Sequence, residues 1–177
     1  MSEPIDRFTR IRWLFKNDFE KIRRQRILIC GVGGVGGFAL DALYRVGIGQ
    51  ITIIDKDVFD VTNQNRQIGS ERTGESKVLV LQDLYKGIQA FGKFISSMGS
   101  AKRLNPKHIQ VGSVWESYGD KFGRKFRDFL KKRRFKGDFK VVFSPEIPHC
   151  IELGSFNVVT ASFGLQIASE VVQDIIK

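Results

Sequence analysis

The sequence has 177 residues, of which 42% are hydrophobic and 27% are charged. This is the composition of an ordinary globular protein, and the length suits one domain rather than two. No apolar run approaches the roughly 20 residues of a membrane-spanning helix, and the N-terminus lacks the pattern of a signal peptide. The two cysteines, Cys30 and Cys150, offer neither a disulfide framework nor a paired zinc motif. We therefore expect a cytoplasmic protein with no membrane partner.

The charge is concentrated in one part of the chain. Lys and Arg number 29 against 19 Asp and Glu, which gives a net charge of +10. Residues 101–140 contain 13 of the basic and 4 of the acidic side chains, so this block alone carries +9. Clustered cations favour a polyanionic partner such as nucleic acid. They also suit a solvated surface helix that keeps a protein dispersed, so composition leaves both interpretations open.

The first third of the chain predicts a βαβ unit. Apolar residues at helical spacing indicate an amphipathic segment over residues 5–22. Next come a short buried strand, a glycine cluster, a helix and a β-branched strand, over residues 26–30, 31–37, 38–46 and 50–54. Such a crossover implies a parallel sheet with helices on its faces. The predicted fold class is therefore α/β, with a Rossmann-like nucleotide-binding sheet.

The rest of the chain alternates further strands and helices. After a polar loop, we predict helices over residues 76–85, 120–134 and 160–176 and strands over residues 93–97, 108–115 and 140–143. The middle helix is strongly basic and carries Phe122, Phe126 and Phe129, whose spacing marks one face that we expect to lie in the core. Cys30, at the end of the first strand, is expected in the core as well.

The glycine cluster carries the first functional signal. Residues 31–36 read Gly-Val-Gly-Gly-Val-Gly, a GxGxxG motif directly after a strand and before a helix. The glycines Gly31, Gly33, Gly34 and Gly36 let the backbone approach a phosphate, and the helix N-terminus favours the anion. Asp55 lies 19 residues beyond Gly36 at the end of the second strand, where its carboxylate can accept hydrogen bonds from ribose hydroxyls. These features predict a nucleotide site without distinguishing ATP from NAD.

The residues after the second predicted strand indicate which nucleotide is bound. Asp55 and Asp57, then Asn63-Gln-Asn-Arg66-Gln67, and then Lys77 on the next helix follow the glycine turn in order. This pattern resembles the ThiF/MoeB/HesA superfamily of ATP-dependent adenylating enzymes, which are relatives of the ubiquitin-activating enzymes. The resemblance implies ATP as the nucleotide, with Asp55 and Asp57 at the ribose side and Asn63, Arg66 and Lys77 around the triphosphate. Arg66 and Lys77 would be the catalytic residues, because attack of a carboxylate on the α-phosphorus develops charge that cations stabilise.

The resemblance also implies a partner subunit and a metal ion. Residues Arg7-Phe-Thr-Arg10 look like an N-terminal motif of the family, whose last arginine reaches the partner subunit's ATP. Arg10 is therefore the candidate for this role in a homodimer. Mg²⁺ is expected from the resemblance, but the aspartate that the family uses as its ligand has no counterpart. Asp83 lies in a helical run rather than at a strand end and is not expected to replace it.

Further segments narrow the family. Five further segments are similar to the tRNA threonylcarbamoyladenosine dehydratase family of the TcdA/CsdL type. They are Thr62 to Ile68, Ser97 to Ala101, Leu104 to Pro106, Val142 to Ser144 and Val159 to Gly164. The resemblance implies an enzyme that uses ATP to activate the carboxylate of the threonylcarbamoyl group on an anticodon-loop adenosine. Ring closure with loss of water then gives the cyclic form. The substrate would be tRNA, with phosphate contacts from Lys131, Lys132, Arg133 and Arg134.

The middle of the chain is shorter than the family pattern. Residues 79–92 occupy an interval in which the family has two further strands and a helix, so a βαβ-sized unit of about 30 residues is absent. We expect a single domain over residues 1–177, with a nucleotide-binding half over 1–92 and a basic, substrate-side half over 93–177. Removal of interior strands exposes the edges of their neighbours unless those edges re-pair.

Three other functions stay open at this point. The first is adenylation of a sulfur-carrier protein of the ubiquitin-like type, in which Cys150 beside His149 would hold the activated partner. The second is a tRNA-binding protein that has lost catalysis together with its missing strands and metal aspartate. The third is an NAD-dependent dehydrogenase, because that class shares the GxGxxG turn.

Overall fold

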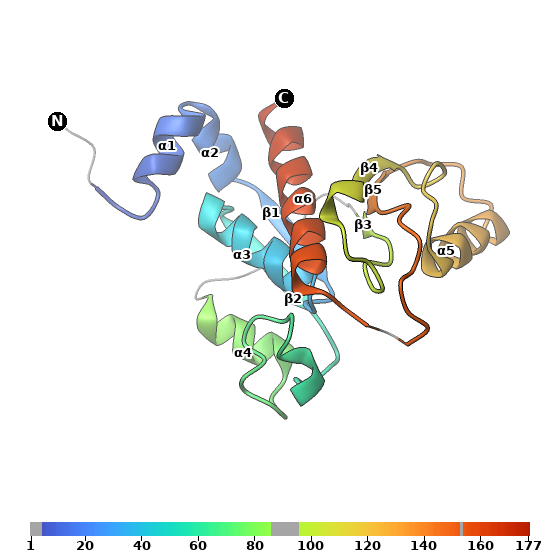
Figure 1. Ribbon diagram of the computed structural model, residues 1–177. Helices are drawn as coiled ribbons and strands as arrows, with labels where there is room; N and C mark the ends of the chain where they lie inside the picture. Colours follow the sequence, from blue (N-terminus) through green and yellow to red (C-terminus); the bar gives the residue numbers. More distant parts are fainter. Residues whose placement is uncertain (1–4, 86–95, 153) are drawn as a thin grey trace.

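The computed structural model describes residues 5–85, 96–152 and 154–177 (Figure 1). Its helices are α1 (Thr9–Phe15), α2 (Asp18–Arg23), α3 (Gly36–Val46), α4 (Lys77–Leu84), α5 (Lys121–Lys132) and α6 (Asn157–Ile176). Its strands are β1 (Arg26–Cys30), β2 (Gln50–Ile54), β3 (Ser96–Ser97), β4 (Gln110–Ser113) and β5 (Lys140–Phe143). None of the helices within these residues is long and apolar enough to cross a membrane.

The predicted βαβ unit is present. β1 and β2 are parallel and in register from Arg26 opposite Gln50 to Cys30 opposite Ile54. α3 connects them and ends at Gly47, whose left-handed φ of 100° lets its N–H bond to the carbonyl of Leu43. Both strands have the bounds that the sequence predicts, and the α/β fold class is confirmed.

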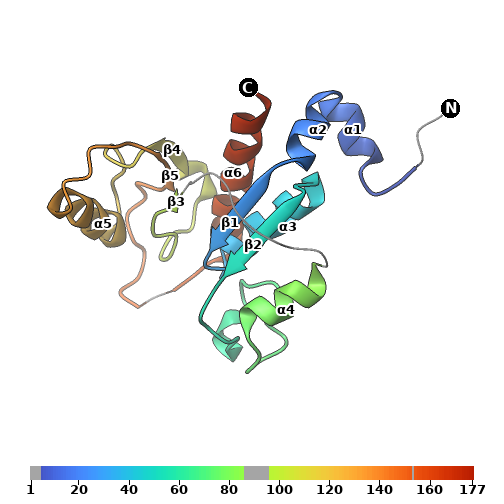
Figure 2. The same cartoon turned by 180° about the vertical axis from the view of Figure 1, so that it is seen from behind.

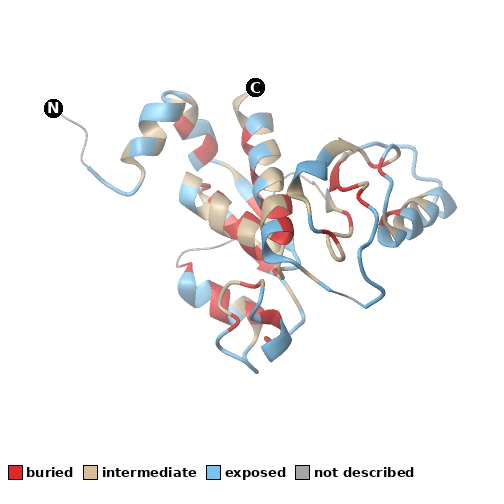
Figure 3. Cartoon of the chain, viewed as in Figure 1, coloured by how far each residue is buried: buried red, intermediate tan, exposed pale blue. Residues whose placement is uncertain are grey.

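The main core lies between this parallel pair and the helices that cover it. α6 lies alongside α3, as both views show (Figures 1 and 2), and a Cβ at Gly164 would collide with the carbonyl oxygen of Val35. Figure 3 shows the buried residues concentrated where these helices meet the strands. The fully enclosed side chains include Ile22, Leu40, Leu43, Ile51 and Leu81.

A second sheet is formed by the C-terminal strands. Its order is β3-β5-β4, with β3 parallel and β4 antiparallel to β5. A separate apolar cluster of Met98, Val114, Val141 and Phe143 lies against it. α5 packs on this cluster through Phe126 and Leu130 and forms the edge of the molecule farthest from α4 (Figures 1 and 2).

The two sheets are not joined to each other within the described residues. β1 and β3 are each the last strand of their own sheet. A cavity of about 620 Å³ lies between them, with walls from β1, α3, β5 and α6. This arrangement agrees with the predicted loss of interior strands, and the flanking edges have not re-paired in the part of the chain that the structure describes.

Two predictions of buried residues are wrong, and the space between the two sheets accounts for one of them. Cys30 is exposed and lines the cavity, since β1 has no described neighbour strand on that side. Phe122 and Phe129 are 56% and 51% exposed, and only Phe126 of the three packs on the second core. A small sheet covers only a narrow stripe of a twelve-residue helix, so the outer rings of the aromatic face stay in solvent.

Several boundaries also differ from the prediction. The N-terminal segment is two short helices, broken at Lys16 with a φ of 49°. The predicted strand over 108–115 shrinks to β4, because Pro106 starts a short 3-10 helix over Pro106–His108. Residues 93–95 of another predicted strand lie outside the described residues, and its remainder is β3. α6 begins at Asn157, three residues before the prediction.

The division into two halves at residue 92 stays a prediction. α6 belongs by sequence to the second half, yet Ala168 and Val172 are part of the β1–β2 core. The last helix therefore packs on the nucleotide-binding half.

The open edge of β1 predicts a reactive thiol at Cys30. In the variant Cys150→Ser, which leaves Cys30 as the only cysteine, we expect Ellman's reagent to modify one thiol per native chain without delay. The measurement is the absorbance change with and without guanidinium. If Cys30 reacts only after unfolding, β1 is covered in solution and the open edge is contradicted.

Candidate nucleotide-binding site

The glycine turn joins β1 to α3 and presents the helix N-terminus. Gly31 has a φ of 86°, in the left-handed region that favours glycine, and its N–H bonds to the carbonyl of Ile54 at 2.7 Å. A Cβ at Gly36 would overlap the carbonyl oxygen of Gly31, so only glycine fits the start of the helix. A Cβ at Gly37, one residue on, would meet its nearest atom at 3.6 Å, an ordinary contact. The turn is therefore tight at Gly36 in particular.

Asp55 fastens this turn to the end of β2. Its Oδ2 accepts a hydrogen bond from the N–H of Val32 at 2.7 Å, and its Oδ1 accepts one from the N–H of Asp57 at 2.9 Å. A carboxylate has about four acceptor positions, so two bonds leave capacity for a ligand hydroxyl. Asp55 thus lies where the sequence predicts, and it has a structural task as well.

The Asn63–Gln67 segment lies directly against the glycine turn. Asp60 and Asn63 cap a 3-10 helix over Val61–Asn63 reciprocally, and bonds from the side chain and backbone N–H of Thr62 lower the pKa of Asp60. Arg66 follows, and its Cγ would be 3.3 Å from a Cβ at Gly34. The guanidinium is held by the carbonyl of Thr62 and by Asn65 Oδ1, both at 2.8 Å. The Arg66 side chain therefore lies against the turn with its charged end fixed by its own segment.

Lys77 is a buried cation at the first position of α4. The residue is only 6% exposed, and its Nζ lies 3.5 Å from Asp57 Oδ2. Its backbone N–H also bonds to the carbonyl of Asp57 at 3.2 Å. Because Asp57 is bonded to Asp55, and Asp55 to Val32, an unbroken chain of contacts links Lys77 to the glycine turn.

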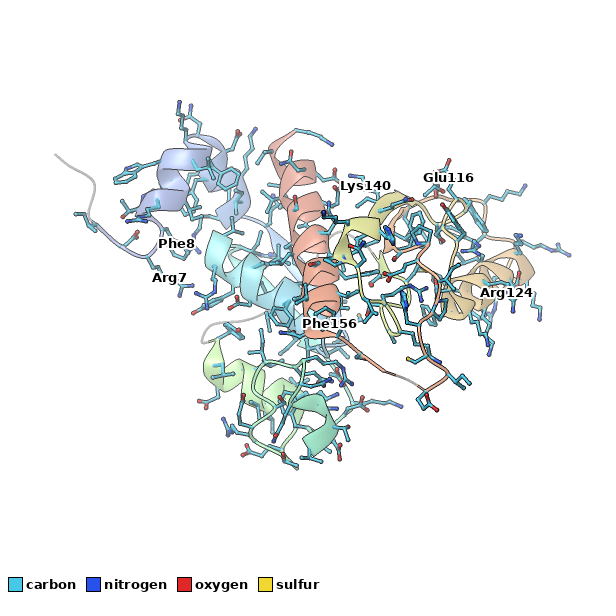
Figure 4. The ribbon with its side chains drawn as sticks, in the orientation of Figure 1. Arg7, Phe8, Glu116, Arg124, Lys140 and Phe156 are labelled. Carbon is cyan, nitrogen blue, oxygen red and sulfur yellow. The ribbon has the colours of Figure 1, made fainter. Side chains whose placement is uncertain are left out.

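Two further side chains reach the turn without having been predicted as site residues. The Gln67 amide would lie 3.7 Å from a Cβ at Gly33, and Thr160 Oγ1 would lie 3.3 Å from one at Gly34. Thr160 belongs to the first turn of α6, just after Phe156 (Figure 4). Asn65 Nδ2 also bonds to the carbonyl of Ser155. Gln67 was visible within the Asn63–Gln67 motif, whereas Thr160 is brought in only by the packing of α6 on α3.

Arg10 lies on a different part of the molecule. It is exposed on α1, which follows Arg7 and Phe8 at the far end of α3 from Phe156 (Figure 4). Arg7 is fixed there by the hydroxyl of Tyr44 at 2.8 Å, and the Phe8 ring would be 3.2 Å from a Cβ at Gly47. The glycine turn is one helix length away, about 16 Å for eleven residues. Arg10 therefore does not join the site of its own chain.

The basic residues that were predicted to contact tRNA lie at the end of α5. Lys131 and Lys132 are in its last turn, Arg133 caps it, and Arg134 follows with a left-handed φ of 55°. All four are exposed, and none of them has an ion-pair partner among the described residues. The negative end of the helix dipole stabilises cations at this position, which is a structural role beside the predicted one.

No metal centre is evident near the turn. Among the residues that the structure describes, no three His, Cys, Asp or Glu side chains are placed to hold a metal ion. Asp83 is instead paired with Arg72 at 2.9 Å, in line with its exclusion as a ligand.

Cys150 and His149 do not form a nucleophile–base pair. Cys150 Sγ bonds to the carbonyl of Glu152, and His149 Nε2 lies 2.8 Å from Glu146 Oε1. Burial alone would raise the pKa of Glu146, but the backbone N–H groups of Leu104 and Asn105, with His149, outweigh it and lower that pKa. These bonds hold the loop between β5 and α6 in place.

The fold and this site define an α/β nucleotide-binding protein in which the Arg66 side chain lies against a glycine turn and Lys77 is linked to the same turn through Asp57 and Asp55. Comparison with known protein families agrees, because residues 6–107 match the model of the ThiF family. The chain belongs to the ThiF family.

Individual relatives support this assignment. The tRNA threonylcarbamoyladenosine dehydratase of Bacillus subtilis strain 168 is 26% identical over 182 residues, which cover 75% of this chain and 72% of that protein. A ubiquitin-like modifier-activating enzyme 5 from Dictyostelium discoideum is 32% identical over 97 residues, which cover 54% of this chain and 26% of that protein. The chain therefore spans about a quarter of the length of this second relative.

A solved structure reproduces the fold. The Escherichia coli tRNA N6-threonylcarbamoyladenosine dehydratase in complex with ATP superimposes with a TM-score of 0.87, at 24% identity, over 96% of this chain and 93% of that chain. The alignment with the Bacillus relative runs over 182 positions but uses only 75% of this chain's 177 residues. About 50 of those aligned positions thus have no counterpart here, in agreement with the predicted shortening.

The tight start of α3 predicts opposite effects of two neighbouring substitutions. Gly36→Ala should destabilise the protein by about 1–3 kcal/mol, because the new methyl group overlaps backbone. Gly37→Ala should be neutral or stabilising by up to about 1 kcal/mol, because alanine favours a helix where there is room. Urea unfolding measures both. Equal effects of the two changes would show that the turn is not as tight as described.

Proposed function

We propose that this protein catalyses the ATP-dependent dehydration of N6-threonylcarbamoyladenosine in the anticodon loop of tRNA. The observation that carries the proposal is that both cations are tied to the glycine turn: the stem of the Arg66 side chain lies against Gly34, and the buried Lys77 is linked to the turn through Asp57 and Asp55. The substrate comes from the relatives in Bacillus subtilis and Escherichia coli, which are named as dehydratases of this nucleoside.

The residues of the chain supply positioning and charge. In the proposed reaction, ATP is a substrate whose phosphates lie over the N–H groups at the start of α3, with Gly31, Gly33, Gly34 and Gly36 giving room for close approach. Asp55 and Asp57 face the ribose side, and Asn63 fixes the segment that carries Arg66. Arg66 presents a planar fork to two phosphate oxygens, and Lys77 acts as a compact charge.

These cations favour the chemical step more than the binding step. A carboxylate oxygen of the substrate attacks the α-phosphorus and pyrophosphate leaves, so negative charge grows on the leaving group as the bond breaks. Lys77 is held in a dry setting by α4, where its charge acts more strongly than in water. A carbamoyl atom of the same nucleoside then attacks the activated carboxyl carbon, loses its proton to solvent and expels AMP, which leaves with one of the former carboxylate oxygens. The nucleoside has thus lost one water, while ATP has become AMP and pyrophosphate.

The dimer and the tRNA contacts are part of the proposal. The exposed position of Arg10, one helix length from its own glycine turn, suits a residue that acts on the partner subunit of a homodimer. The cations Lys131, Lys132, Arg133 and Arg134 project from α5, and their charge suits tRNA phosphates. A tRNA substrate also fits the cytoplasmic location that the sequence predicts.

Mg²⁺ is not assigned a protein ligand in this proposal. The described residues lack a cluster that could hold it, and Asp57 is already paired with Lys77. Any Mg²⁺ that accompanies ATP would be carried by the phosphates, and no step of the reaction is attributed to it.

The alternative of a sulfur-carrier adenylyltransferase is weakened by the loop between β5 and α6. Its thioester step needs an activated thiol, but His149 is engaged by Glu146 rather than by Cys150. ATP–pyrophosphate exchange that is stimulated by a ubiquitin-like protein, and not by tRNA, would favour this alternative over the dehydratase.

Substitution of the two cations tests the proposed reaction. Arg66→Ala and Lys77→Met should each lower ATP-dependent conversion of the modified adenosine at least about 10-fold, because a hydrogen bond to a charged group is worth about 1.5–3 kcal/mol. Methionine keeps the buried aliphatic stem of Lys77. Conversion is measured by mass spectrometry of nucleosides after digestion of the tRNA.

Arg72→Ala is the matched control for these variants. Arg72 lies between Arg66 and Lys77 in sequence, but it is exposed and paired with Glu75 and Asp83. Its removal should leave conversion near the parental rate. Near-parental activity of both Arg66→Ala and Lys77→Met would contradict the proposal, and binding of tRNA with no conversion by the parental protein would identify a non-catalytic relative.

A further inference from the structure

The cavity between the two sheets is lined both by residues of the glycine turn and by a residue of the basic helix α5. Its wall includes Gly31 and Gly36 of the glycine turn as well as Phe122 of α5. At about 620 Å³, it lies within the range of cavities that take small organic ligands, roughly 300–1,000 Å³. No residue of this space has a role in the reaction proposed above, apart from the two glycines.

The lining of the cavity is apolar, and its charged groups are paired with each other. Ile29, Ala39 and Ile167 are among the aliphatic residues that face it. Lys140 Nζ, also in the wall, lies 3.1 Å from Glu170 and 2.6 Å from Asp174, and Figure 4 shows Lys140 beside α6. Because two carboxylates face this one lysine in the wall, the cavity does not attract phosphate. It suits a neutral group with apolar faces and a few polar edges.

Phe122 provides a flat ring beside this space. It is 56% exposed, and its ring stacks on Phe126 with an angle of 5° between the planes and 6.0 Å between the centroids. Phe126 is anchored in the second core, so the outer ring has a fixed support. Unpaired nucleic acid bases stack on such rings irrespective of sequence.

The surroundings of Phe122 supply the charge that a nucleic acid backbone needs. Residues 121–136 contain nine Lys and Arg and one acidic residue. Eight of these cations are exposed, and Arg124 lies on α5 at the outer edge of the molecule (Figure 4). Phe129 lies seven residues from Phe122, hence on nearly the same side of the helix and about 10 Å along it. Its ring lies under the guanidinium of Arg133 at 5.2 Å.

We propose that the cavity between the two sheets receives an unpaired base of the substrate RNA, stacked on Phe122, while the cations of α5 hold the flanking phosphates outside. The mainly apolar wall, which has no unpaired cation among its lining residues, favours the base, and the basic helix favours the phosphate backbone. Because Phe122 and the glycine turn line the same cavity, a nucleoside bound there would lie beside the proposed ATP site. This inference rests on the proposed function for the identity of the RNA, although the binding itself needs no ATP.

The test measures binding of an anticodon stem-loop RNA without ATP, by fluorescence anisotropy, to the full chain. Phe122→Ala should weaken binding about 10-fold, the size of effect that loss of one base–aromatic stack produces. The dependence of affinity on salt should not change, because no phosphate contact is lost. Lys131→Ala with Lys132→Ala should instead flatten the salt dependence. Trp13→Ala is the matched control, since this ring is 70% exposed on α1, outside the basic block, and should bind RNA as the parent does.

An abasic site at the target adenosine separates stacking from general binding. With this RNA, Phe122→Ala should cost no further affinity. RNA should also protect Cys30, which lines the cavity, from Ellman's reagent in the Cys150→Ser background, and the abasic RNA should not.

Two results would overturn the inference. The first is equal loss of affinity on Phe122→Ala for the intact and the abasic RNA. The second is protection of Cys30 that rises with protein concentration and is indifferent to RNA, which would mean that another polypeptide fills the gap between the sheets. Because no readout here depends on ATP, failure of the proposed dehydration leaves these outcomes separately measurable.

Discussion

The hydrogen bonds of a single carboxylate hold the candidate site together. Asp55 accepts the N–H of Val32 from the glycine turn and the N–H of Asp57 from its own loop, and Asp57 in turn contacts Lys77. The backbone bond from Gly31 to Ile54 already joins the turn to β2, and the Asp55 side chain adds the connection that runs on through Asp57 to the start of α4. The tight packing at Gly36 sets the shape of the turn. Asp55 holds Asp57, and with it Lys77, on the side of the turn that faces the end of β2.

The site is therefore largely independent of the strands that the chain lacks. Its residues come from the βαβ unit, from the loop between β2 and α4, from the start of α4 and from the first turn of α6. The shortening changes the other side of β1, where a cavity replaces a neighbouring strand within the described residues. One chain can therefore combine a divided sheet with an intact glycine turn. The shortening leaves a cavity beside β1 instead.

The features that could be predicted from the sequence are those set by residue types close together in the chain. Both strands of the parallel pair, the glycine turn and the Asn63–Gln67 motif are encoded by residue types at fixed spacing, and the structure has them close to the predicted positions. Thr160 lies within the family-like segment Val159 to Gly164, but its place beside Gly34 follows from the packing of α6 on α3, which the sequence does not show. Sequence reasoning also placed Cys30, Phe122 and Phe129 in the core, since their pattern is apolar and their exposure follows from a missing neighbour and a small sheet. Periodicity shows which face of a helix is apolar, but not how much sheet is present to cover it.

Binding of ATP to the chain tests most directly whether the shortened protein retains a complete nucleotide site. By isothermal titration calorimetry, we expect one ATP per chain for the parental protein and no saturable binding for Asp55→Ala, whose loss leaves the N–H groups of Val32 and Asp57 without their acceptor. The Arg72→Ala protein serves as the matched control and should bind as the parent does. Absence of ATP binding by the folded parental chain would contradict the account.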